Sequence, residues 1–140
     1  MLLARSLEHW TGRTLIHGSP TPVDVSRFLF EAPFVLVSHG TEADPVLSYG
    51  NQVALRLWEL SWEEFTATPS RLTAEAPNRQ ERARLLDAVH RCGYIDDYAG
   101  VRISSSGRRF RIQKATVWDL ISEEGDRVGQ AAMFDRWQYL

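Results

Sequence analysis

The chain has 140 residues, 44% of them hydrophobic and 24% charged, and a formal net charge of −2. This is the composition of one soluble globular domain with a single core, and the small net charge argues against a general attraction to nucleic acid or an acidic membrane. The single cysteine excludes an internal disulfide and favours a reducing compartment, which we take to be the cytoplasm.

The sequence also lacks the patterns of a membrane protein and of a metal site. No stretch approaches the roughly 20 apolar residues that span a bilayer. The four histidines and the cysteine are scattered, without the spacing of metal ligands. We therefore expect no membrane contact and no metal.

Residues 1–32 predict a helical arm that precedes the folded domain of residues 33–140. Apolar residues at helical spacing, with charged ones between them, indicate an amphipathic helix that ends near Gly18. Its apolar stripe consists of Leu3, Leu7 and Trp10. A further helical turn or two over residues 24–30 ends before Pro33, which cannot continue a helix.

Short strands and short helices alternate in the next part of the chain. Strands are predicted over residues 34–38 and 46–49. Asn51 is placed to cap a helix over residues 52–59. Ser61 and Glu64 form a capping box that opens the following helix.

The longest predicted helix spans residues 79–92, after a second capping pattern that begins at Asn78. Gly93 is well placed as its C-terminal cap. The apolar stripe of this helix consists of Leu85, Leu86, Val89 and Cys92.

Three consecutive antiparallel strands are predicted at the end of the chain, over residues 94–103, 108–121 and 128–137. Turns that contain Gly107 and Gly125 separate them. In the middle strand the core-facing residues fall on even positions. They are Phe110, Ile112, Thr116, Trp118 and Leu120.

Lys114 conflicts with this alternation, because strict counting places it on the apolar face. A lysine in a core must find a partner, lose its charge or line a polar cavity. We favour a bulge at Gln113 and Lys114 that turns the side chain outward. Without a bulge, Lys114 and Thr116 would anchor an anionic ligand.

The order of these elements is that of a PAS domain. The run from Gly50 to Trp58, with its capping asparagine, and the run from Ser61 to Phe65 resemble the corresponding PAS segments. More narrowly, residues 34–140 resemble the MEKHLA domain, a PAS-related family, in its stand-alone bacterial form. The resemblance is carried by residues 34–40, 94–104, 107–112 and 129–137.

The resemblance implies an α+β fold, a PAS-like five-stranded antiparallel sheet with helices on one face. It implies a sensory or regulatory domain without an enzymatic role, which binds an unidentified small molecule or a protein partner. One alternative is a structural interaction module whose own aromatic residues fill the core. The other is an enzyme that acts on a small organic substrate.

A ligand, if one binds, is expected between the long helix and the sheet. The candidate contacts are Leu86, Val89, Ile112, Thr116 and Trp118, with Lys114 added if no bulge is present. Flavin is not expected: light-sensing PAS domains carry a cysteine in the region that matches residues 69–73, which has none, and Cys92 reads as a small buried hydrophobe. Haem is not expected either, because His90 lies beside the apolar stripe, where the helix dipole accounts for it.

Other reactive or charged groups have simpler explanations. Ser38, His39 and Asp44 are close in sequence, but neighbours on a strand point to opposite faces, so we expect no catalytic site. The same holds for the pair Asp96 and Asp97. A basic cluster is offset by nearby acidic residues, so nucleic-acid binding is not expected. The cluster consists of Arg102, Arg108, Arg109, Arg111 and Lys114.

The apolar stripe of the arm predicts a homodimer, because a domain of this size need not bury that stripe itself and an exposed stripe invites association. The competing outcome is a monomer in which the arm folds back onto its own sheet.

Overall fold

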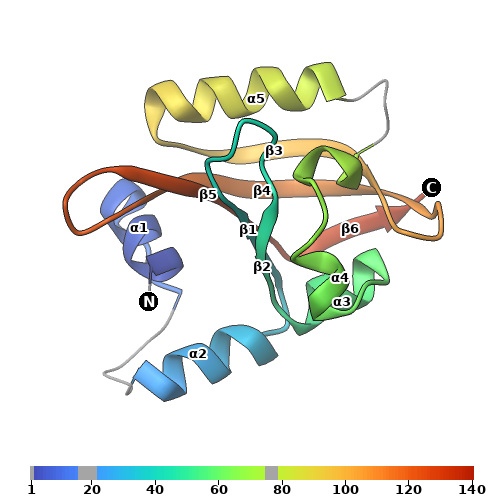
Figure 1. Ribbon diagram of the computed structural model, residues 1–140, viewed down its shortest axis with the longest axis horizontal. Helices are drawn as coiled ribbons and strands as arrows, with labels where there is room; N and C mark the ends of the chain where they lie inside the picture. Colours follow the sequence, from blue (N-terminus) through green and yellow to red (C-terminus); the bar gives the residue numbers. More distant parts are fainter. Residues whose placement is uncertain (1, 16–21, 75–78) are drawn as a thin grey trace.

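The computed structural model describes residues 2–15, 22–74 and 79–140 (Figure 1). The helices are α1 (Leu2–Thr11), α2 (Pro22–Glu31), α3 (Gln52–Trp58), α4 (Trp62–Phe65), the 3₁₀ helix η1 (Ser70–Thr73) and α5 (Arg79–Cys92). The strands are β1 (Val35–His39), β2 (Leu47–Gly50), β3 (Tyr94–Ile103), β4 (Arg109–Ile121), β5 (Arg127–Phe134) and β6 (Arg136–Tyr139). They form one antiparallel sheet in the order β2-β1-β5-β4-β3, with β6 paired to β4.

The predicted α+β architecture is confirmed, with one change in the sheet. The last predicted strand divides at Asp135 into β5 and β6, so the sheet has six strands. The first helix is also shorter than predicted. It ends at Thr11 because Gly12 adopts the left-handed conformation, with a φ of 73°, and the predicted end at Gly18 lies outside the described residues.

A bulge at Gln113 and Lys114 confirms that Lys114 turns outward. Lys114 has a φ of 51° and its side chain is exposed. The pairing with β3 shifts here, and β4 changes its other neighbour from β6, opposite Gln113, to β5, opposite Thr116. The extra residue reverses the alternation, so residues of odd number face the core after the bulge.

The expectation that Thr116, Trp118 and Leu120 share the face of Ile112 is therefore wrong. Ile112 and Ala115 belong to the inner cluster beneath α3 and α4. Trp118 and Leu120 belong to a second cluster beneath α1. Trp118 is buried, as expected, but on the opposite face of the sheet.

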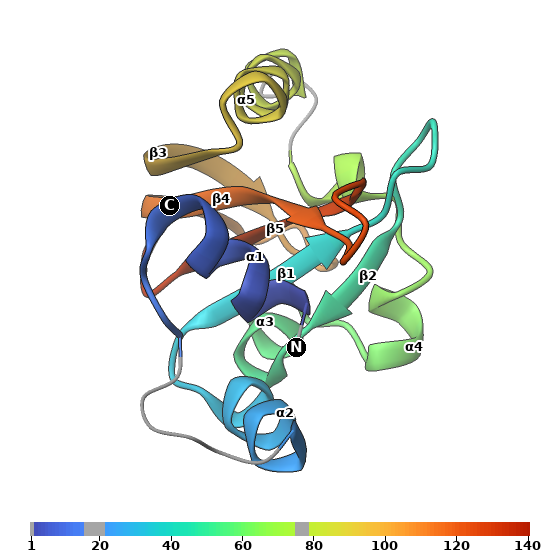
Figure 2. The ribbon, with the colours of Figure 1, turned by 90° about the vertical axis from the view of Figure 1, so that its left-hand side faces the viewer.

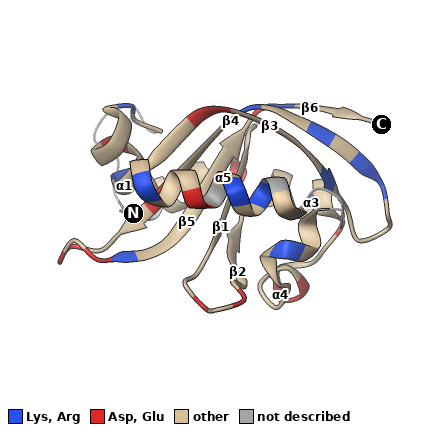
Figure 3. Ribbon diagram, turned by 90° about the horizontal axis from the view of Figure 1, so that it is seen from above, with Lys and Arg blue, Asp and Glu red and all other residues tan. Residues whose placement is uncertain are grey.

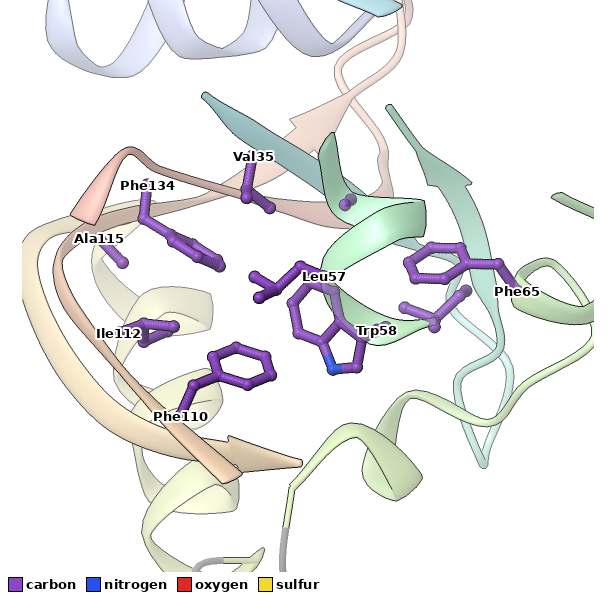
Figure 4. Close-up of a cluster of buried hydrophobic side chains, with 10 residues drawn as sticks. Val35, Leu57, Trp58, Phe65, Phe110, Ile112, Ala115 and Phe134 are labelled. Atoms are coloured by element: carbon purple, nitrogen blue, oxygen red, sulfur yellow. The ribbon is translucent and has the colours of Figure 1, made fainter. Parts of the chain in front are cut away.

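The inner cluster is built on aromatic side chains (Figure 4). The ring of Trp58, from α3, meets Phe65, Phe110 and Phe134 edge to face, at centroid distances of 6.2, 5.4 and 6.2 Å. Such pairs contribute about 0.5–1.5 kcal/mol each beyond the burial of their surface. This cluster fixes α3 and α4 on the sheet.

The outer face is covered by α1, which lies across the sheet (Figure 2). Leu3 and Leu7 are buried there with Trp118. The indole Nε1 of Trp118 donates to the carbonyl of Leu3 at 3.1 Å, and Nε1 of Trp10 donates to the carbonyl of Asp119 at 2.9 Å. The arm thus packs on its own sheet, which is the arrangement expected for the monomeric alternative, and the homodimer stays a prediction.

Asn51 confirms its predicted role as a cap and has a wider one. Its Oδ1 accepts hydrogen bonds from the backbone N–H groups of Ala54 and Leu36, at 3.2 and 3.1 Å. Its Nδ2 donates to the carbonyls of Phe34 and Leu29, at 2.8 and 3.1 Å. One fully buried amide therefore ties α2, β1 and α3 together.

Replacing Trp118 by alanine is expected to lower the free energy of unfolding by about 3–5 kcal/mol, because a large buried side chain leaves a cavity. The matched control is Trp62→Ala: Trp62 is 40% exposed and contacts only Tyr49 among the aromatic rings described, so its loss should cost at most about 1 kcal/mol. Urea unfolding measures both. Equal losses would contradict the placement of Trp118 beneath the arm.

Gly93→Ala should cost more than Gly107→Ala. Both glycines have a left-handed backbone, with φ values of 92° and 87°, so each substitution carries about 1 kcal/mol of backbone strain. A Cβ at Gly93 would also lie 2.5 Å from the Trp10 ring, whereas one at Gly107 has nothing within 4 Å. We expect about 1–3 kcal/mol of extra loss at Gly93, and the addition of Trp10→Ala should remove that excess. Equal losses at the two glycines would show that Trp10 is not seated there.

Candidate functional site

A cavity of about 70 Å³ lies between the inner face of the sheet and the segment formed by η1 and α5. Its apolar wall contains Val37, Leu47, Trp58, Phe65, Leu85, Ile112, Val117, Ala131, Ala132 and Phe134. Its polar wall contains Ser38, His39, Ser70, Thr73, Arg82, Tyr98, Arg102 and Gln130. The volume is about half that of an engineered cavity of ~150 Å³ that admits benzene. The space suits a ligand of a few heavy atoms.

Two guanidinium groups line the cavity without a carboxylate partner among the described residues. Arg102, on β3, is 7% exposed and donates from Nη2 to the hydroxyl of Tyr98 at 2.9 Å. Arg82, on α5, donates to the hydroxyl of Ser70 on η1. Burial and the nearby Arg102 lower the pKa of Arg82 to about 10, so Arg82 is still a cation at neutral pH.

His39 and Gln130 face each other across the β1–β5 pairing and leave two buried acceptors unused. Nδ1 of His39 lies 2.8 Å from the carbonyl of Gly40, which can only accept, so Nδ1 carries the proton and Nε2 of the neutral ring is an acceptor. Nε2 of His39 and Oε1 of Gln130 find no partner among the described residues. Burial, together with Arg82 and Arg127, lowers the pKa of His39, although the Gly40 carbonyl and the Gln130 amide favour its charged form.

Asp119 holds the amide of Gln130 in place from behind the cavity. Its Oδ1 accepts from Nε2 of Gln130 and from Nε of Arg127, both at 3.0 Å. Asp119 is 4% exposed, so this ion pair cancels a charge that would be costly to bury alone. The amide orientation that leaves Oε1 of Gln130 free follows from this contact, because a carboxylate requires a donor.

The structure brings together only part of the predicted ligand site. Ile112 lines the cavity and Val89 is buried, while the side chain of Leu86 lies outside the described residues. Lys114 is exposed at the bulge, and Thr116 and Trp118 lie on the other face of the sheet. Thr116 instead accepts a hydrogen bond from Arg13 of the arm at 3.0 Å.

The polar residues of the cavity were not predicted from the sequence. One signal was present for Arg82, which precedes Leu85 and Val89 by three and seven residues and so shares their stripe on α5. For Arg102 and Gln130 the alternation along their strands was too irregular to assign a face.

The two residues considered above for flavin and haem, Cys92 and His90, do not lie at this cavity. The expectation that Cys92 is buried is wrong, since it is exposed, and His90 is exposed as well. Neither residue lines the cavity. In the described ranges, no cluster of His, Cys, Asp and Glu side chains could hold a metal ion, and no helix there is long and apolar enough to cross a membrane.

The predicted basic cluster does not form one face. Arg102 is buried in the cavity wall, and Arg108 stacks on the ring of Tyr139 at 3.5 Å. Figure 3 shows basic residues along α5 and at the hairpin between β3 and β4, with acidic residues in the β1–β2 loop and at α4.

The fold is that of PAS and light-oxygen-voltage sensory domains. A PAS domain of a Colwellia psychrerythraea protein superposes with a TM-score of 0.69 at 12% identity, over 84% of this chain and 95% of that one. An RNA-binding light-oxygen-voltage receptor superposes with a TM-score of 0.69 at 16% identity, over 84% of this chain and 36% of that one. A light-oxygen-voltage domain studied with a flavin analogue superposes with a TM-score of 0.62 at 17% identity, over 84% of each chain. These similarities concern the fold alone.

The chain belongs to the MEKHLA domain family, whose model matches residues 1–139. That match includes the N-terminal arm, beyond the segment from residue 34 that carried the resemblance in the sequence; the boundary between residues 32 and 33 stays a prediction. The homeobox-leucine zipper protein ATHB-14 of Arabidopsis thaliana is 28% identical over 100 residues, which are 71% of this chain and 12% of that protein. The chain thus spans about an eighth of this relative, and the stand-alone bacterial form also stays a prediction.

Protonation of His39 should destabilise the fold as the pH falls. Its pKa is lowered in the folded state, so its contribution is complete above the ordinary value of 6.5 and is lost below it, where the unfolded chain takes up the proton first. The limiting slope is about 1.4 kcal/mol per pH unit. Urea unfolding at pH 7.5, 6.5 and 5.5 should show a steeper loss for the wild type than for His39→Gln. Parallel pH profiles would mean that His39 is not the titrating group.

Proposed function

We propose that this chain is a sensory or regulatory domain that takes up a small molecule in the cavity between the sheet and the η1–α5 segment. The observation that supports this best is the set of buried polar groups around the cavity that find no partner in the described part of the chain. Natural proteins satisfy nearly all such groups, so Nε2 of His39 and Oε1 of Gln130 indicate a space that holds water or a polar ligand.

The packing of β4 suggests how occupancy of the cavity would reach the rest of the molecule. Ile112 and Val117 line the cavity from one face of this strand. Thr116 and Trp118, between and beside them, hold the arm on the other face. A ligand that displaced β4 would therefore directly change the contacts that Thr116 and Trp118 make with the arm. The signal would be a change in the packing of α1 and in what it contacts.

The structural module without a ligand remains the second candidate. The aromatic cluster of Trp58, Phe65, Phe110 and Phe134 fills much of the space beneath α3 and α4, as that hypothesis requires. The polar wall does not favour it, because a filled scaffold gains nothing from two guanidinium groups in the cavity wall for which the described residues supply no carboxylate.

We propose no enzymatic role and no flavin or haem. The purified protein is expected to be colourless, since Cys92 and His90 lie outside the cavity wall. A homodimer, a protein partner and a cytoplasmic location remain part of the proposal as they were expected from the sequence.

Ligand-observed NMR with neutral, anionic and cationic fragments of three to six heavy atoms tests the proposal. At least one fragment should give a saturable signal with the wild type. Ala132→Leu should abolish it, because Ala132 lines the cavity and the added atoms occupy the space. Ala99→Leu is the matched control on an exposed position of the sheet and should leave the signal intact. Absence of any saturable fragment would contradict a ligand-binding cavity.

A further inference from the structure

We propose that the ligand of this cavity is a short-chain carboxylate, held at its charged end by Arg82 and Arg102. This inference rests on the proposed function and names the chemical class of the ligand. Its basis is the charge balance of the cavity wall and the apolar character of most of the remaining lining residues.

The cavity wall carries two cations and no compensating anion among its residues. Arg82 and Arg102 come from different elements, α5 and β3. Arg82 donates to the hydroxyl of Ser70, and Arg102 donates to the hydroxyl of Tyr98 and to the carbonyl of Val101. A guanidinium has five donors, so each group keeps donors beyond these bonds. Burying a charge without a counter-charge is costly, and an anion between the two groups would offset that cost.

The contrast with Arg127 shows what a structural arginine looks like in this chain. Arg127 donates to the carboxylate of Asp119 at 3.0 Å, and the two charges cancel. Arg82 and Arg102 have no such partner in the part of the chain that the structure describes. Their charge is therefore available to a ligand.

The size of the cavity and its apolar lining residues discriminate between different anions. A volume of about 70 Å³ admits only a few heavy atoms. Ile112, Val117 and Phe134 face that space, and they offer nothing to the outer oxygens of a phosphate or a sulfate. A carboxylate with one or two carbons attached presents two oxygens to the guanidinium groups, a geometry that arginine recognises well, and an apolar tail to the apolar lining residues.

Calorimetric titration of the full chain at constant ionic strength tests the inference with acetate, propionate, their amides acetamide and propionamide, and inorganic phosphate. Propionate should bind saturably and at least about tenfold more tightly than propionamide, because the amide lacks the charge that the guanidinium groups recognise. Phosphate should bind more weakly than propionate.

Arg82→Gln should weaken propionate binding about tenfold or more, since a hydrogen-bonded charge pair is lost. The matched control is Arg84→Gln, on the same helix at an exposed position outside the cavity wall, and it should stay within about twofold of the wild type. Arg102→Gln is a second test, although its burial makes loss of folding a possible result; the comparison of ligands on the wild type needs no variant.

Each other outcome overturns the inference in a distinct way. Equal binding of propionate and propionamide would reject the anion while leaving a ligand-binding cavity. Tighter binding of phosphate would reject the carboxylate. Equal effects of Arg82→Gln and Arg84→Gln would reject the assigned site. If no carboxylate binds but a neutral or cationic fragment does, the inference fails and the proposed function stands; if no probe of any kind binds, both fail and the cavity holds water only.

Discussion

The bulge at Gln113 and Lys114 is the constraint on which the rest of the structure depends. It places one extra residue in β4 and reverses which side chains face the core. Before it, β4 pairs with β6 and contributes Ile112 to the inner face. After it, β4 pairs with β5, contributes Val117 to the cavity and turns Trp118 toward the arm. A β4 of strict alternation could not build both layers in this way.

The interior of the domain holds charge in two different arrangements. Where Asp119 meets Arg127, an ion pair reinforced by Gln130 is internally balanced and acts as a rigid support. Where Arg82 and Arg102 line the cavity, the described residues provide no carboxylate to neutralise them. Buried ionic groups rarely increase stability over a well-packed apolar core. The presence of Arg82 and Arg102 in the cavity wall is therefore better explained by binding of a ligand than by a contribution to the stability of the fold.

Features set by local chemistry could be read from the sequence. The cap at Asn51, the capping box of Ser61 and Glu64, and Gly93 at the end of α5 were all predicted and are confirmed, because each depends on a few neighbouring residues. The bulge was predicted from the cost of burying Lys114. The prediction did not include its consequence, which is that the residues after the bulge reverse the faces to which they point. Thr116 and Trp118, two of the six candidate ligand contacts, were therefore assigned to the wrong face.

The polar wall could not be predicted in the same way, because it is assembled from residues far apart in the sequence. Arg82, Arg102 and Gln130 meet only once the sheet has formed and α5 has crossed it. The same assembly connects the cavity to the arm through one residue. The side chain of Asp119 accepts from Gln130, its N–H donates to the carbonyl of Gly93 at the end of α5, and its carbonyl accepts from Trp10. The ring of Trp10 also packs against Gly93. If a ligand in the cavity displaced α5 or Gln130, the displacement would therefore reach the arm through the contacts of Trp10 with Gly93 and Asp119.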